Sequence, residues 1–404
     1  WDGFTNLLTR FPLFRKVTEI SLNYELPKYF KNLFPAIFLF IIFTWLELIY
    51  GATKSPKVTA YMGIAMALGA LIFVLLFPKK AFCKYICLVG RISGLYSNLA
   101  PLEIRSKKAE VCASCTSEEC FKGSKKSYPC PTGLSLKSVQ DSTYCIQCTE
   151  CIKGCPYENV GLNLRLPGSD IKAKRENGNL AGGRIDEAWM MLTMLALTLF
   201  HGLGMTTVWE NFAPGEMSIM RYLTMHLSND RMINATFGVT IFCGLLALLY
   251  CVSSSWAKKL AGIPDGFQER EGSRALFIQL AFPLLPTTVA YHIAHNLGHI
   301  VMEGFTFLAI VSDPLGSGAD YFGTKDFIGV GMLGGSTLWI LQVVIIILGH
   351  ALSIILTHRV VTGLYADKKR ARLAALPMLL MSIILSGLAL TLSCIDMNMR
   401  MTYF

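Results

Sequence analysis

The chain has 404 residues, of which 53% are hydrophobic and only 16% are charged, and its mean hydropathy is +0.46. Soluble domains carry about a quarter charged residues, so this composition excludes a purely soluble protein and predicts surface that meets lipid. The net charge of +10 does not indicate a nucleic-acid partner, because the basic residues are concentrated in particular loops, as they are in membrane proteins.

Residues 1–32 form the first predicted element. Aromatic and leucine side chains alternate there with scattered Arg and Lys, which predicts an amphipathic segment that lies at the membrane interface. The chain begins at Trp1 rather than Met and has no signal peptide, so we expect that a further N-terminal piece precedes it.

Seven apolar runs follow, each long enough for the ~20 residues with which a helix crosses a bilayer. They lie at 33–51, 59–77, 187–208, 232–252, 275–303, 334–357 and 374–394. The predicted fold class is therefore mainly α: a polytopic membrane bundle of about seven helices. Helices 1 and 2 occupy 33–77, and helices 3 to 7 occupy 187–404.

The charges in the loops predict the orientation. The insert 78–186 has 17 Lys or Arg against 10 Asp or Glu, and the loop 358–373 has five basic residues against one acid. The loop 303–333 has four acids against one Lys. Seven spans place both basic loops on one side, which is then the cytoplasmic side.

Ten of the thirteen cysteines lie between Cys83 and Cys155, all within the polar insert 78–186. Cys145, Cys148, Cys151 and Cys155 follow the C-x2-C-x2-C-x3-C-P spacing of bacterial ferredoxins, which hold [4Fe–4S] clusters through thiolates. Such spacing in a membrane protein favours iron–sulfur clusters over disulfides. The insert is therefore predicted to be a ferredoxin-like domain with two clusters.

Two-cluster ferredoxins exchange their last cysteines, and that analogy predicts the pairing. One cluster takes Cys130, Cys145, Cys148 and Cys151, and the other takes Cys112, Cys115, Cys120 and Cys155. The alternative is a zinc module held by four cysteines, which pairs of C-x2-C motifs also build.

Cys83 and Cys87 stand apart, one helical turn from each other at the cytoplasmic end of the second span. They are predicted either to take part in a further redox or cofactor site or to be buried as small apolar residues. Cys243, Cys251 and Cys394 lack metal-binding spacing, and we interpret them as packing residues.

The segment 33–165 resembles the membrane polyferredoxins of the NapH, NosR and CcoG group. The resemblance is carried by two spans, then Phe82-Cys83-Lys-Tyr-Ile-Cys87-Leu-Val-Gly90, then Leu102-Glu-Ile-Arg105 and two ferredoxin-type motifs. It implies two cytoplasmic [4Fe–4S] clusters in the inner membrane of a prokaryote, with electron transfer linked to quinol and to a cytochrome or periplasmic reductase. This sequence departs from the group at Leu88, where a proline is expected.

Five histidines in the fifth and sixth spans are candidate ligands: His292, His295, His299, His350 and His358. The first three share a helical face by their spacing, and ionisable residues inside a bilayer are costly and functional by default. We expect His295 and His350 to approach each other at similar depth. The readings left open are a b-type haem, a copper or other metal site, and a packing cluster or proton path to a quinone. His201, alone in the third span, is predicted to pack or to line a quinone pocket.

The function predicted first is that of a membrane electron-transfer subunit of a quinol-linked respiratory complex. It would pass electrons between the quinone pool or the cytoplasmic side and a membrane or periplasmic redox partner. The alternatives are an assembly factor that reduces a metal centre and a transporter with a regulatory iron–sulfur domain. The absence of an internal repeat speaks against the transporter.

Overall fold

The computed structural model describes residues 24–50, 56–77, 82–130, 132–139, 141–173, 175–176, 179–180, 184–206, 208–209, 230–304, 306–314, 317–326 and 333–395. Most of the predicted amphipathic segment 1–32 therefore lies outside the described residues. The chain divides into two compact units, which are described separately: 1–194 with 229–240, and 195–228 with 241–404.

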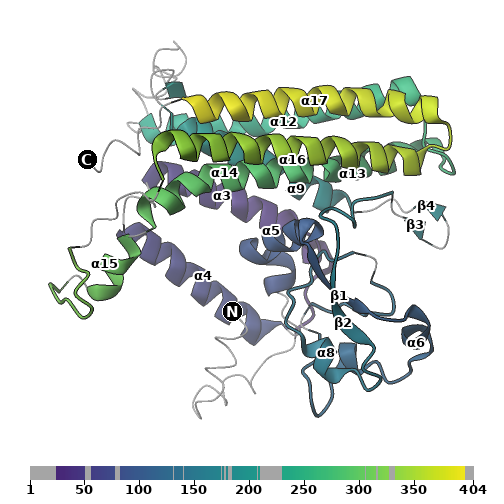
Figure 1. The fold of residues 1–404 in the computed structure, drawn as a ribbon, viewed down its shortest axis with the longest axis horizontal. Helices are drawn as coiled ribbons and strands as arrows, with labels where there is room; N and C mark the ends of the chain where they lie inside the picture. The colour runs from purple at the N-terminus through teal and green to yellow at the C-terminus, as the bar shows by residue number, and fades with distance from the viewer. Residues whose placement is uncertain are drawn as a thin grey trace. The chain divides into compact units, whose positions relative to one another are not determined.

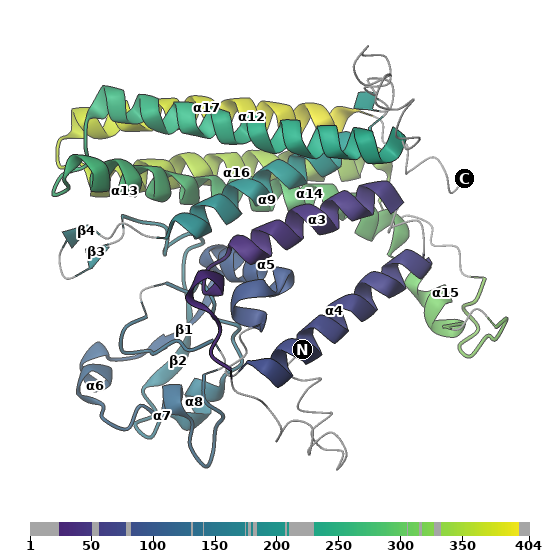
Figure 2. The ribbon, with the colours of Figure 1, turned by 180° about the vertical axis from the view of Figure 1, so that it is seen from behind.

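The first unit begins with helices that match the first two predicted spans. They are α3 (Phe34–Tyr50) and α4 (Pro56–Leu76), followed by a π-helical turn η2 (Phe82–Ile86) and by α5 (Leu88–Tyr96). Helix α5 packs against α3 and η2 (Figure 2). Trp45 of α3 donates a hydrogen bond of 2.8 Å to Thr236 Oγ1 in the N-terminal part of α12 (Asp230–Ala261).

The cysteine-containing segment of this unit has little regular structure besides one pair of strands. β1 (Leu102–Ser106) and β2 (Val160–Leu164) are antiparallel, with Ile104 opposite Leu162 (Figure 1). Between them lie the short helices α6 (Ala109–Ser114), α7 (Glu119–Lys122) and α8 (Glu150–Gly154). Ile104 and Val160 are buried, whereas Leu162 and Leu164, which share a face of β2 with Val160, are exposed. The strand pair therefore closes a loop that contains eight cysteines.

The second unit is a bundle of long helices. α13 (Glu269–Ala281) continues through a 3-10 turn, η5 (Phe282–Leu284), into α14 (Leu285–Glu303). Pro283 and Pro286 lack the N–H groups that a regular helix needs there, which explains the local tightening. Helix α14 packs against α16 (Gly335–Leu364), and α16 against α17 (Lys368–Cys394). Ser353 of α16 donates a hydrogen bond of 2.6 Å to the carbonyl of Pro283.

Helices occur at each predicted span, but they differ in their capacity to cross a bilayer. Four are long and apolar enough: Met232–Ala261, Glu269–Val301, Gly335–Leu364 and Lys368–Cys394. Two further apolar helices in the described part of the chain, Phe34–Tyr50 and Lys57–Phe73, are shorter. The third predicted span corresponds to α9 (Ile185–Gly204). The protein is thus mostly helical and has four candidate membrane helices, and the number seven stays a prediction.

Candidate functional site

The eight cysteines between β1 and β2 line two separate pockets. Site 1 is lined by Cys130, Cys145, Cys148 and Cys151 in a space of about 490 Å³, which includes volume open to solvent. Site 2 is lined by Cys112, Cys115, Cys120 and Cys155 in a space of about 400 Å³, measured in the same way. The structure thus brings together the same two quartets that the ferredoxin spacing groups. In each quartet one cysteine comes from the motif that supplies the other three to the neighbouring site.

The backbone around both sites adopts a conformation that L-residues seldom take. Among the described residues, every non-glycine residue with positive φ lies in this segment: Glu118, Tyr144, Gln147, Thr149 and Glu158. Left-handed residues bend a chain tightly, and successive N–H groups in such turns point inward. The conformation costs free energy, and it persists where a functional loop is held in place by its surroundings. The sequence gives little sign of it, because none of the five is glycine.

Several groups already donate hydrogen bonds to the sulfur atoms. The backbone N–H of Leu134 lies 3.3 Å from Cys130 Sγ, and that of Asn159 lies 3.3 Å from Cys155 Sγ. The Asn159 side chain donates a further bond of 3.4 Å to Cys112 Sγ. N–H donors stabilise thiolates and tune the clusters that thiolates hold. Asn159 therefore joins the two ends of site 2, a role that its sequence position does not reveal.

The environment affects the cysteine pKa values differently. Backbone hydrogen bonding at Glu118, then the Ser117 side chain, lowers the pKa of Cys115. Burial raises the pKa of Cys120 and Cys145, and burial together with the neighbouring thiols raises that of Cys151 to about 12. The raised pKa values of Cys145 and Cys151 favour their neutral thiols near pH 7, so a metal that binds these two sulfur atoms as thiolates would displace their protons.

The cysteines of each site are not gathered around one point. In the described part of the chain, no three His, Cys, Asp or Glu side chains are grouped as ligands of a single metal ion. A zinc ion needs four sulfur atoms that each lie ~2.3 Å from one centre. A [4Fe–4S] cluster instead binds each thiolate through a different iron, so its four sulfur ligands lie farther apart. The spacing of the sulfur atoms is thus the property that distinguishes a zinc ion from a [4Fe–4S] cluster as the occupant of such a site.

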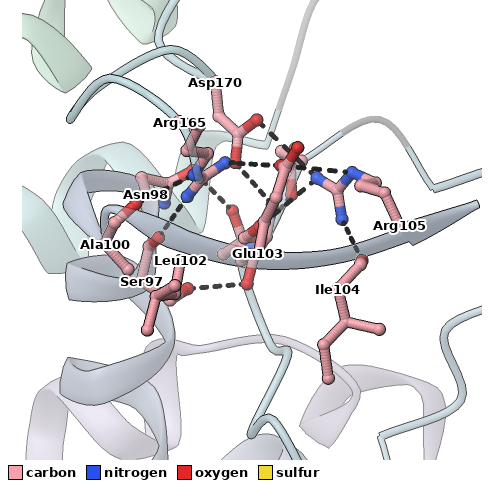
Figure 3. Close-up of polar contacts among 12 residues, drawn as sticks. Ser97, Asn98, Ala100, Leu102, Glu103, Ile104, Arg105, Arg165 and Asp170 are labelled. Atoms are coloured by element: carbon pink, nitrogen blue, oxygen red, sulfur yellow. Dashed lines mark hydrogen bonds and ion pairs between the residues drawn. The ribbon is translucent and has the colours of Figure 1, made fainter. Parts of the chain in front are cut away.

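A network of two arginines and two acids supports site 1 (Figure 3). Arg165, whose side chain is 6% exposed, donates to the carbonyls of Ser97 and Ala100, at 2.6 and 2.9 Å. Its guanidinium also pairs with Glu103 at 3.2 Å and with Asp170. These contacts hold together the segments that flank one end of the strand pair, where β1 begins and β2 ends.

The same network extends to the wall of site 1. Arg105, which lines that site, pairs with Glu103 at 3.5 Å and with Asp170 at 3.7 Å. Asp170 accepts a hydrogen bond of 2.7 Å from the N–H of Ser142, and the carbonyl of Ser142 accepts one of 2.9 Å from the N–H of Cys145. The acids therefore hold the turn that leads into Cys145.

The histidines form one group and one separate position. The rings of His201 and His295 lie 5.2 Å apart edge to face, and those of His295 and His299 lie 5.5 Å apart. Tyr291 is stacked on His295 at 6.2 Å. We call His201, Tyr291, His295 and His299 the histidine column. His292 lies on the same helix, α14.

His350 does not join the column. Its Nδ1 lies 3.1 Å from Ser382 Oγ and 2.8 Å from Ser386 Oγ, both on α17. The preceding residue, Gly349, is the one that faces α14, where an added Cβ would meet Ala290 and the Pro286 carbonyl. Because His350 follows Gly349 on α16, its imidazole points in a different direction from the α14-facing position 349 and lies against α17. The expected approach of His295 to His350 is not found, and His358 is exposed.

Cys87 is buried in a small apolar cluster with Ala70, Phe82 and Ile86. Its N–H bonds to the Phe82 carbonyl at 2.8 Å, which closes the π-helical turn that contains Cys83. The Cys83 side chain lies outside the described atoms. Neither reading of this pair is decided by the fold.

Comparison with known proteins gives one distant similarity. No family model matches the chain, and no solved structure does. Over 163 residues the chain is 26% identical to a protein of Escherichia coli (strain K12) named "Putative electron transport protein YccM". The match spans 39% of this chain and 41% of that protein, so the chain covers less than half of the curated relative. The relative's name associates it with electron transport.

Proposed function

We propose that this chain is a membrane-bound electron-transfer protein that holds one [4Fe–4S] cluster in site 1 and another in site 2. The observation that carries the proposal is the pair of pockets, each lined by four cysteines that exchange one member between two motifs. Hydrogen bonds to the sulfur atoms and the left-handed turns around them support it. The similarity to a protein named for electron transport agrees with it.

The residues of the chain supply the environment in which such clusters work. Cys130, Cys145, Cys148 and Cys151 would hold the cluster in site 1, and Cys112, Cys115, Cys120 and Cys155 would hold the cluster in site 2. When bound, a cluster takes up and releases single electrons. The N–H donors stabilise the reduced, more negative state, while the Arg105 network fixes the charge beside site 1.

The finer part of the proposal concerns topology. Seven helices would cross the cytoplasmic membrane of a prokaryote, with α3, α4 and α9 added to the four candidates, and segment 78–186 would face the cytoplasm. The basic loops support this orientation. A cysteine introduced at Ser169 should not react with a membrane-impermeant thiol reagent added to intact cells. The control is the unchanged protein, which measures the labelling of the native thiols. Labelling from outside would refute the orientation.

The histidine column supports a further step, in which the membrane part exchanges electrons and protons with quinol. A quinol releases protons along with electrons, and neutral imidazoles accept protons near pH 7. The buried Tyr291 hydroxyl, which has no hydrogen-bond partner among the described residues, adds a free donor beside His295. The alternative use of these histidines is ligation of haem b, as a relay across the ~30 Å apolar slab to a cytochrome or periplasmic reductase.

The test is chemical analysis combined with redox titration of the purified full chain. Two clusters give about eight iron and eight acid-labile sulfide per chain. Bound zinc without labile sulfide would overturn the proposal. Haem absorption bands in the same titration would favour the haem relay over the quinol site. If the protein is an assembly factor, the cluster-containing form should reduce the metal centre of another protein stoichiometrically. If it is a transporter, uptake of a substrate should depend on the clusters.

A further inference from the structure

The rim of site 2 differs in charge from the rest of the cysteine-containing segment. Residues 107–137 carry six exposed lysines against three acids, of which Glu110 is exposed and Glu118 and Glu119 are partly buried. The exposed lysines are Lys107, Lys108, Lys122, Lys125, Lys126 and Lys137. Only Lys122 among them has an acidic partner in the described part of the chain, Glu118 at 3.0 Å. This surface therefore presents an excess of uncompensated positive charge.

Backbone hydrogen bonds, an ion pair and the lining of the pocket connect four of these lysines, Lys107, Lys108, Lys122 and Lys137, with site 2. Lys137 lines the pocket itself. The N–H groups of Lys107 and Lys108 bond to the backbone and side chain of Asn159, at 2.7 and 2.9 Å, and Asn159 lines the same pocket. Lys122 reaches it through Glu118, another lining residue. The positive charge is thus gathered around one of the two candidate clusters.

Site 1 provides an internal comparison, because the charged residues that line it are compensated. Arg105 is paired with Glu103 and Asp170. Glu150 is paired with Lys153 at 2.7 Å. A positive-inside topology would make the insert basic as a whole, but it would not by itself place unpaired lysines beside site 2.

The same rim exposes aromatic surface close to the cysteines. Tyr157 lines site 2 two residues after Cys155, and 56% of its surface is exposed. Phe121 follows Cys120 directly and is 37% exposed. Aromatic residues are enriched at the centres of protein interfaces, whereas lysines occupy the rim and accelerate encounter with an opposite charge. Small interfaces of this kind are typical of transient electron-transfer complexes.

We propose that the rim of site 2 is a docking surface for an acidic, soluble electron-carrier protein. Tyr157 and Phe121 contact the carrier at the centre, and the lysines steer it. One electron passes between the reduced carrier and the site 2 cluster, while no bond forms or breaks and no proton moves. The inference rests on the proposed function, since the electron needs a cluster at site 2.

The test measures the second-order rate at which a reduced plant-type [2Fe–2S] ferredoxin, an acidic probe, reduces the full chain in neutral detergent. Cluster content is first established by iron and sulfide analysis. Steering between opposite charges raises association rates by about 10 to 10³-fold and is screened by salt. The rate should therefore fall steeply with ionic strength. Replacing Lys108, Lys125, Lys126 and Lys137 by Gln should lower it about tenfold or more at low salt and abolish most of the salt dependence.

Two controls separate charge steering from damage to the cluster. Lys172→Gln removes an exposed lysine outside the 107–137 segment and should leave the rate unchanged. Reduction by dithionite should be equal in all variants, since a small reductant needs no docking surface. A salt-independent rate, or equal loss in the Lys172→Gln variant, would overturn the docking surface while leaving the clusters in place.

An anionic membrane is the other partner that a basic rim could bind. If the quadruple variant keeps its rate but binds less tightly to vesicles that contain phosphatidylserine, the rim serves lipid and the proposal is wrong. If iron and sulfide are absent from the wild-type protein, the proposed function itself fails. This failure can be told apart from a failure of the docking surface, because iron and sulfide are measured before any rate.

Discussion

The Tyr144 hydroxyl donates a hydrogen bond to the carboxylate of Glu187, a residue of α9 that is 4% exposed. Tyr144 immediately precedes Cys145, and its ring lies 4.6 Å from the guanidinium carbon of the buried Arg91. Burial, followed by the charge of Glu187, raises the pKa of Tyr144, so the hydroxyl stays protonated and remains a donor. One side chain therefore links the loop of site 1 to α5 and to α9.

Tyr144→Phe keeps the ring over Arg91 but removes the donor to a buried carboxylate. Hydrogen bonds to charged groups contribute about 1.5–3 kcal/mol, so we expect a loss of stability in that range. Thermal unfolding in detergent, followed by circular dichroism, measures it. Tyr157→Phe is the matched control, because Tyr157 is exposed and no described bond involves its hydroxyl. Equal behaviour of the two variants would show that the Glu187 contact contributes nothing.

Double substitutions test how the cysteines are paired. Cys130 shares site 1 with Cys148, while Cys120 lies in site 2. Each single Ser variant should lose one cluster, or about four of eight irons. The pair Cys130→Ser with Cys148→Ser should lose no more than either single variant, whereas Cys130→Ser with Cys120→Ser should lose both clusters. The reverse pattern in iron and sulfide content would reassign Cys130 to site 2. Cys251→Ser, outside both sites, should retain all the iron.

Arg165→Met should destabilise the cysteine-containing segment strongly. The change leaves Glu103 and Asp170 without their best-buried partner and removes donors from two carbonyls. Breaking a buried ion pair on one side costs about 3–5 kcal/mol. Limited proteolysis and cluster retention report the loss. Arg165→Lys should recover only part of it, because an ammonium cannot reproduce the planar set of guanidinium donors. If the Lys variant were as stable as the wild type, only the positive charge of Arg165 would matter, and not its set of hydrogen-bond donors.

Gly349 and Gly387 provide a matched pair in the membrane bundle. An Ala Cβ at position 349 would meet Ala290 and lie 2.8 Å from the Pro286 carbonyl oxygen, whereas at position 387 it meets nothing within 4 Å. Overpacking costs about 1–3 kcal/mol, while Gly→Ala in a helix otherwise stabilises by about 0.5–1 kcal/mol. Thermal unfolding should therefore show Gly349→Ala less stable and Gly387→Ala at least as stable as the wild type. An opposite order would mean that α14 and α16 do not approach at Gly349.

The loop between α12 and α13 provides a pH-dependent contact. The N–H of Ala366, then the Arg370 guanidinium, lowers the pKa of Asp265. A carboxylate with a lowered folded-state pKa contributes stability above its unfolded pKa of about 3.9, and this is lost as the pH falls through the folded value. Asp265→Asn should thus be slightly less stable than the wild type at pH 7, and the difference should vanish in acid. The effect is small because both side chains are more than one third exposed. A difference that grows in acid would contradict this assignment.

Sequence periodicity located the helices better than their ends. The run 232–252 begins within two residues of α12, but the helix continues to Ala261, because backbone hydrogen bonds propagate beyond the point where the serines after Val252 end the apolar stretch. The same reasoning fails for His350. The Gln342 side chain donates a hydrogen bond of 2.8 Å to the carbonyl of Ala294, so His295 lies near the level of Gln342, whereas Gly349 lies opposite Pro286 and Ala290. His350 therefore differs from His295 in depth as well as in the direction of its side chain.

The candidate site was predictable where the chemistry imposes spacing. The ferredoxin rhythm grouped the cysteines that the structure brings together, because a cluster ligand set restricts the chain between its members. Arg165 had no such signal: it meets Glu103 across more than sixty residues of chain, through a strand register that composition does not reveal, and Asp170 joins them by pairing with Arg165. Tyr144 and Glu187, at opposite ends of a loop, were missed for the same reason.

The β1–β2 pair has a consequence for how the protein matures. Because Ser106 pairs with Val160, the two ends of the eight-cysteine loop are held together by backbone bonds that involve no thiol. Closing a flexible loop of about fifty residues costs conformational entropy, which grows with the logarithm of its length. A folded apoprotein has already met that cost, so incoming iron and sulfide need to order only the short turns within the loop. Assembly machinery would then receive two preformed, half-open cavities rather than an unfolded chain.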